Sequence, residues 1–140
     1  MDYSFKIINS SAGSGKTFKL AIEYISKLFS KKNDEHFKSM LALTFTNKAS
    51  AEMKYRIILY LNDLKYQSNK IVLDEILKIT GLDESTIHKR SSTILEKILY
   101  NYSNFNVITI DSFTNNIIKT VNAELENKDD FLVEFDNQIY

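Results

Sequence analysis

Apolar residues along this chain alternate between short continuous runs and stripes with helical spacing. Residues 5–8 form a run typical of a buried strand, and from Lys16 onward apolar side chains recur three and four positions apart, which predicts an amphipathic helix. Further runs of strand length lie at residues 40–45 and 105–111, and each precedes another helical stripe. The pattern therefore predicts an α/β fold with a mostly parallel sheet.

Residues 65–104 interrupt this alternation, because their apolar spacing is helical throughout. An apolar cluster ends at Gly81, which is a usual helix stop, and Asp83 is suited to cap the helix that follows. We therefore expect a helical insertion between the second and third strands. The expected divisions are residues 1–64 (first strand, loop and two helices around the second strand), 65–104 (insertion), 105–127 (third strand and its helix) and 128–140 (start of the next segment).

Length and composition favour one globular domain, since the chain has 140 residues and is 44% hydrophobic. The absence of cysteine excludes disulfides and cysteine-based chemistry. No apolar run is long enough to span a bilayer, and the first residues lack the apolar core of a signal peptide, so we expect a cytoplasmic protein without a membrane partner. The net charge is zero, yet residues 1–70 carry twelve Lys and Arg against six Asp and Glu. This excess either attracts phosphate-bearing ligands or is a solvated surface with unevenly placed lysines, and the charge alone does not decide between the two.

Two of the three glycines, Gly13 and Gly15, lie between the first predicted strand and the first predicted helix. The local sequence INSSAGSGKTF fits the end of the phosphate-loop pattern G-x-x-x-x-G-K-[ST], with serine at the first glycine position. Backbone N–H groups at such a helix start can bind phosphate oxygens. Lys16, the predicted catalytic residue, would reach the β- and γ-phosphates, and the Thr17 hydroxyl would bind Mg²⁺. The predicted nucleotide-binding residues are Ser10, Ser11, Ala12, Gly13, Ser14, Gly15, Lys16 and Thr17.

Two further strings carry a family resemblance: LTFTNKASAEMKYRI at residues 43–57 and ITIDSFT at residues 108–114. With SSAGSGKT upstream, the chain resembles the N-terminal motor domain of superfamily 1 DNA helicases, the group of UvrD and Rep. The helical insertion resembles the helicase-nuclease subunits RecB and AddA more closely. Serine at the first glycine position is common in that family. The resemblance implies a RecA-like three-layer α/β/α fold with a parallel sheet, incomplete in this chain, and ATP and Mg²⁺ as cofactors.

The resemblance also implies a track for single-stranded DNA. Its expected contacts are Phe45, Thr46, Asn47, Lys48, Thr109 and Ser112. An aromatic ring can stack a base, and neighbouring polar groups can bind phosphate and sugar, although from the residues alone a plain helix cap with a core phenylalanine is the commoner arrangement. Asp111 replaces the family's usual histidine, and a carboxylate beside a DNA phosphate is unfavourable. We therefore expect Asp111 to cap the following helix. A role for Asp111 as a Mg²⁺ ligand is a weaker interpretation, because no glutamate follows it.

The function implied by the resemblance is that of the ATP-binding part of an ATP-dependent single-stranded DNA translocase or helicase, from a helicase-nuclease in double-strand break repair. The expected partners are single-stranded DNA and a second helicase-nuclease subunit. The chain lacks an acidic metal site and a water-orienting residue, so we expect it to be inactive alone. Two alternatives stay open. One is a non-catalytic phosphate-loop module, and the other is a small-molecule kinase, which would need an arginine-rich lid where this chain has only Arg56 and Arg90.

Overall fold

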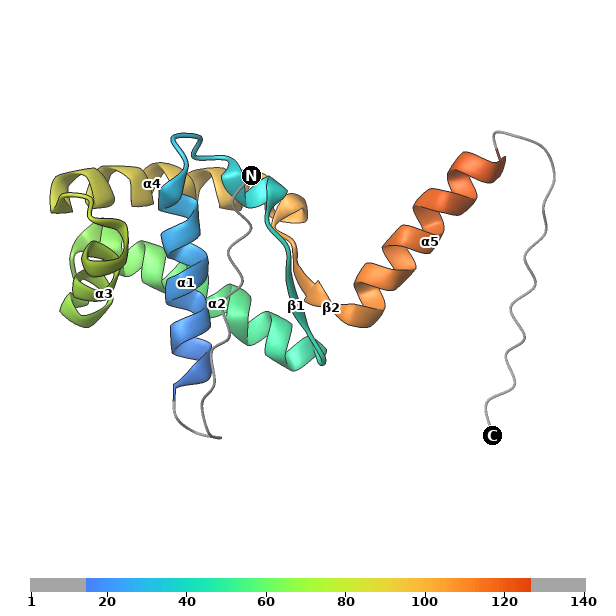
Figure 1. The fold of residues 1–140 in the computed structure, drawn as a ribbon, viewed down its shortest axis with the longest axis horizontal. Helices are drawn as coiled ribbons and strands as arrows, with labels where there is room; N and C mark the ends of the chain where they lie inside the picture. Colours follow the sequence, from blue (N-terminus) through green and yellow to red (C-terminus); the bar gives the residue numbers. More distant parts are fainter. Residues whose placement is uncertain (1–14, 127–140) are drawn as a thin grey trace.

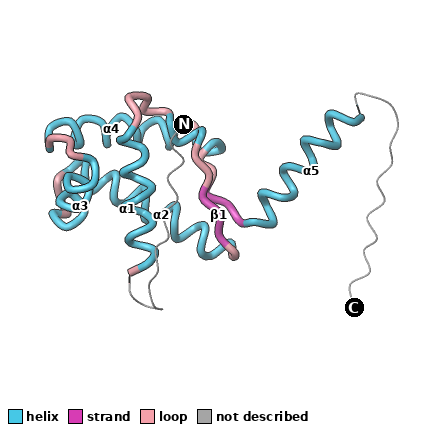
Figure 2. Tube along the Cα trace, viewed as in Figure 1, coloured by secondary structure: helices cyan, strands magenta, loops and turns pink. Residues whose placement is uncertain are grey.

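The computed structural model describes residues 15–126, and Figures 1 and 2 show their arrangement. The helices are α1 (Lys16–Ser30), α2 (Asn47–Tyr66), α3 (Lys70–Thr80), α4 (Glu84–Tyr100) and α5 (Ile110–Glu126), with short 3-10 helices at His36–Ser39 and Tyr102–Asn104. The strands are β1 (Ala42–Thr44) and β2 (Val107–Thr109). The strand predicted at residues 5–8 lies outside the described residues. The fold is mixed α/β and mostly helical.

The described sheet consists of β1 and β2, which run parallel although more than sixty residues separate them in the sequence. Leu43 pairs with Ile108, and Thr44 pairs with Thr109. Both strands are shorter than the apolar runs predicted, because the chain turns into a helix soon after each of them. Helix α2 packs against both strands. The expected three-layer arrangement stays a prediction, since the described residues supply only this small parallel sheet.

Helix α1 follows the predicted apolar stripe closely. Its buried apolar residues are Ala21, Ile22, Tyr24, Ile25, Leu28 and Phe29. They face α2 and α3, and they belong to one core with residues of every described α-helix except α5. The periodicity of the sequence therefore identified both the helix and its inward face, because burial of one stripe is what stabilises an amphipathic helix.

The helical character predicted for residues 65–104 corresponds to the pair α3 and α4, while the status of this segment as an insertion, with the other predicted divisions of the chain, stays a prediction. Gly81 ends α3 with φ 66°, a left-handed conformation that favours glycine, and the Asp83 carboxylate accepts a hydrogen bond from the Thr86 backbone N–H at the start of α4. Helix α4 packs along α2, and α3 packs against α1. The insertion therefore shares the core of the domain.

Helix α5 leads away from the helical body, as Figure 1 shows. It contacts the sheet, yet its apolar residues Ile117 and Val121 are 48% and 46% exposed. The sequence predicted this helix from an apolar stripe, and the structure leaves much of that stripe uncovered by the described residues. None of the helices that the structure describes combines the length and apolar character that a membrane span requires.

Candidate nucleotide and DNA site

The described part of the phosphate loop is its end, where Gly15 leads into α1. Gly15 has φ 78° and ψ 23°, and its carbonyl accepts the first helical hydrogen bond from the Lys19 N–H at 3.0 Å. A Cβ at Gly15 would meet no atom within 4 Å, so the requirement for glycine is conformational and not steric. Lys16 and Thr17 follow as the first two helical residues, the former exposed and the latter half-buried. Both side chains therefore lie at the positive end of the helix dipole.

The rest of the predicted loop lies outside the described residues, so its roles in nucleotide binding stay predictions. These residues are Ser10, Ser11, Ala12, Gly13 and Ser14.

A hollow of about 380 Å³ lies beside this helix start, and Gly15, Lys16, Thr17, Phe18 and Arg56 line it. The sequence motifs indicated no role for Arg56, but the packing of α2 against α1 brings its guanidinium to the predicted phosphate-binding residues. Two cationic side chains and a helix N-terminus at one hollow form a site suited to a polyanion such as a nucleotide triphosphate.

The Arg56 guanidinium is fixed by residues one turn away on either side of it. Its Nε and Nη2 contact Glu52 Oε1 at 3.0 and 2.9 Å, and its Nη1 donates a hydrogen bond to the Tyr60 hydroxyl at 3.3 Å. The hydrogen bonds to Tyr60 and then Glu52 raise the pKa of the guanidinium above its usual range, so Arg56 stays charged. Tyr60 in turn packs edge-on against Phe18, with ring centroids 5.6 Å apart. The spacing of Glu52, Arg56 and Tyr60 by four residues was a sequence signal for this arrangement.

The first predicted DNA segment lies at the carboxyl end of β1. The Phe45 side chain is 87% exposed, so it is not the core residue that the plain helix-cap interpretation requires. Thr46 is the N-cap of α2, since its hydroxyl accepts a hydrogen bond from the Ala49 N–H at 3.1 Å. Asn47 and Lys48 are both exposed. The segment thus presents an uncovered aromatic ring next to polar and cationic groups.

The second predicted DNA segment lies at the carboxyl end of β2. Thr109 is buried, and its hydroxyl donates to Ser112 Oγ at 2.8 Å and accepts from the Ser112 N–H at 3.1 Å. Thr109 therefore caps α5, and the expectation that Asp111 caps this helix is wrong. Asp111 lies instead within the first turn, exposed, where the helix dipole favours its negative charge. The cap lies two residues earlier because the helix already begins at Ile110.

The parallel sheet brings the two segments together. Because Thr44 pairs with Thr109, the chain leaves both strands at the same edge, toward Phe45 in one case and Ser112 in the other. The N-terminal end of α1 and the carboxyl end of β1 lie at the same end of the molecule in Figure 1. The residues predicted from separate motifs therefore gather at one end of the fold, as ligand sites of parallel α/β sheets do.

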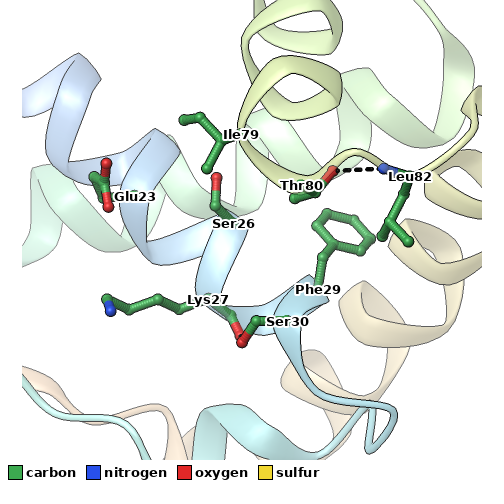
Figure 3. A pocket seen from close by; sticks show the side chains of 8 residues that line it. All are labelled: Glu23, Ser26, Lys27, Phe29, Ser30, Ile79, Thr80 and Leu82. Atoms are coloured by element: carbon green, nitrogen blue, oxygen red, sulfur yellow. Dashed lines mark hydrogen bonds between the residues drawn. The ribbon is translucent and has the colours of Figure 1, made fainter. Parts of the chain in front are cut away.

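A second hollow, of about 370 Å³, lies between the C-terminal ends of α1 and α3 (Figure 3). Its lining includes Glu23, Lys27 and Phe29 from α1 and Ile79 and Thr80 from α3. None of the predicted site residues lines this second hollow. The hollow beside Lys16 is therefore the better candidate for the nucleotide site on chemical grounds, although the two volumes are similar. Within the described residues, no group of three or more histidines and carboxylates is placed to hold a metal ion.

The pattern that defines the UvrD/REP helicase N-terminal domain matches residues 4–139. The chain belongs to this helicase family. Among curated proteins, it is 36% identical over 107 residues to an ATP-dependent helicase/nuclease subunit of Ruminiclostridium cellulolyticum and 32% identical over 146 residues to the RecB subunit of the RecBCD enzyme of Buchnera aphidicola subsp. Schizaphis graminum. These matches cover 75% and 96% of this chain but only 8% and 12% of the relatives. No solved structure shows significant similarity to it.

Proposed function

We propose that this member of the UvrD/REP family is the ATP-binding part of an ATP-dependent single-stranded DNA translocase or helicase, within a helicase-nuclease that acts in double-strand break repair. The observation that carries the proposal is the gathering of Lys16, Thr17 and Arg56 at one hollow, at the same end of the fold as the carboxyl end of β1, which Phe45 directly follows. The names of the relatives support the helicase-nuclease assignment. We further propose the RecA-like three-layer fold for the whole domain and a cytoplasmic location.

In the proposed nucleotide site, the backbone N–H groups of residues 10–17 surround the phosphates, and the Lys16 ammonium pairs with the β- and γ-phosphate oxygens. The Thr17 hydroxyl fits a Mg²⁺ ligand, because it is a hard oxygen donor one residue from that lysine, and the ion would neutralise phosphate charge. Arg56, held by Glu52 and Tyr60, adds a guanidinium to the same hollow, although the Glu52 carboxylate offsets part of its charge. This placement extends the proposed site beyond the loop itself.

In the proposed DNA site, the exposed Phe45 ring stacks a base, and Asn47 and Lys48 contact the backbone. The Thr46 and Thr109 hydroxyls are engaged in caps, so these two threonines shape the ends of the track by fixing where α2 and α5 begin. Ser112 is half-buried at the start of α5. The relatives are named as subunits, which supports a further protein chain as a partner of the full-length enzyme.

A comparison of nucleotides tests this site. We expect the chain to bind Mg²⁺-ATP and Mg²⁺-GTP with similar affinity and AMP at least about tenfold more weakly, since the described lining offers charge for phosphates and only the Phe18 ring for a base. Stacking tolerates either purine. Isothermal titration calorimetry with each nucleotide measures the difference. A strong preference for ATP over GTP would contradict a site dominated by phosphate contacts.

A further inference from the structure

Tyr55 lies on the outer face of α2, where 64% of the residue is exposed. It follows Lys48 by seven positions and Ala51 by four, and these two residues are also exposed. Residues with this spacing share one face of a helix. With a rise of 1.5 Å per residue, Tyr55 lies about 10 Å along the axis from Lys48. The stripe therefore continues from the proposed DNA segment along the helix.

The neighbouring side chains on α2 are engaged elsewhere in the fold. Glu52 pairs with Arg56, and the Lys54 ammonium lies over the rings of Tyr102 and Phe105, at 4.9 and 5.9 Å from their centroids. The side chains of Lys48 and Tyr55 form no hydrogen bond or ion pair with any residue that the structure describes. The small Ala51 side chain between them leaves the surface open. An aromatic ring and a cation are thus both accessible along one stripe.

We propose that Tyr55 extends the single-stranded DNA track, stacking a base two helical turns beyond the Phe45–Lys48 segment while Lys48 pairs with the intervening backbone. This inference rests on the proposed function and adds a contact that none of the recognised motif residues supplies. Base stacking on an exposed aromatic side chain is tolerant of sequence, which suits a translocase. Tyr55 also precedes Arg56, so consecutive residues of α2 face the proposed DNA track and the proposed nucleotide hollow.

The test is binding of fluorescently labelled oligothymidylate to the 140-residue chain at low salt, followed by fluorescence anisotropy. We expect Tyr55→Ala to weaken binding about fivefold or more and Tyr55→Phe to leave it nearly unchanged, because stacking requires the ring and not the hydroxyl. Binding of a duplex of the same length should be insensitive to Tyr55→Ala, since its bases are already stacked.

Tyr100 provides the matched control. It is 90% exposed on α4 and belongs neither to the Phe45–Lys48 segment nor to the stripe on α2, so Tyr100→Ala should bind oligothymidylate like the unmodified chain. Loss of binding in Phe45→Ala with no change in Tyr55→Ala would overturn this inference and leave the proposed function intact. Absence of oligothymidylate binding by the unmodified chain would overturn both the inference and the proposed DNA site. A loss in Tyr55→Phe equal to that in Tyr55→Ala would contradict stacking.

Discussion

Replacing Arg90 with alanine is expected to lower the free energy of unfolding by about 2–4 kcal/mol. The Arg90 guanidinium on α4 contacts Asp34 Oδ1 at 2.8 Å and donates to the carbonyls of Phe29 at 2.9 Å, Lys31 at 2.6 Å and Leu28 at 3.4 Å. These are the carbonyls at the C-terminal end of α1, which have no partner within the helix.

Loss of Arg90 would leave several acceptors without their partner in a region with little access to water. The side chains of Arg90 and Asp34 are only 18% and 21% exposed, and the guanidinium also lies over the Phe29 ring, 5.4 Å from its centroid. The expected loss exceeds that of a surface ion pair for this reason, since exposed pairs contribute about 1 kcal/mol or less. The contacts join the helical insertion to α1, the helix that carries Lys16.

Urea unfolding followed by circular dichroism measures this effect. Arg90→Lys should lower the free energy of unfolding nearly as much, because an ammonium cannot reproduce the planar guanidinium, whose N–H groups reach three carbonyls and a carboxylate. The exposed neighbour Lys89 is the matched control, and Lys89→Ala should stay within about 0.5 kcal/mol of the unmodified chain. An Arg90→Ala variant as stable as Lys89→Ala would show that these contacts do not hold α4 to α1.

Replacing Lys16 with alanine is expected to weaken Mg²⁺-ATP binding by about 10- to 100-fold, the consequence of losing about 1.5–3 kcal/mol of charge-assisted hydrogen bonding. Lys16 is exposed, so the substitution removes no packing and should leave the fold intact. Its ammonium lies at the start of α1, where the helix dipole and Arg56 already favour negative charge.

Lys19 is the control for Lys16, since it is an exposed lysine one turn further along the same helix. Lys19→Ala changes the net charge equally but removes no residue from the lining of the hollow. Calorimetric titration should therefore give an affinity within about twofold of the unmodified chain. Equal losses in the two variants would mean that Lys16 acts through general electrostatic attraction and not through a specific phosphate contact.

The features that sequence predicted well are those with local causes. The apolar stripe of α1, the cap at Asp83 and the stop at Gly81 each depend on residues within one or two turns. The capping residue of α5 was harder to predict from the sequence, because Thr109 and Asp111 lie two residues apart and the side chain of either can cap a helix. A local sequence pattern cannot decide which of these two residues caps the helix, because that depends on where β2 ends.

The features that sequence could not predict depend on contacts between distant segments. Arg56 reaches the hollow only because α2 packs against the start of α1, and Arg90 meets carbonyls that precede it by about sixty positions. No periodicity or capping signal encodes such distances. The exposure of Phe45 likewise follows from the sheet edge at which β1 ends, although its motif had already indicated an accessible ring.

Backbone amide chemical shifts during successive titrations test the central claim most directly, namely that one end of this fold binds both a nucleotide and single-stranded DNA. In nitrogen–proton correlation spectra of the chain, Mg²⁺-ATP should shift the amides of Gly13, Gly15, Lys16 and Thr17. Oligothymidylate should then shift those of Phe45 and Lys48. Nucleotide-induced shifts that leave the amides of residues 13–17 unchanged would contradict this claim, because they would place the phosphates away from the loop and from the start of α1.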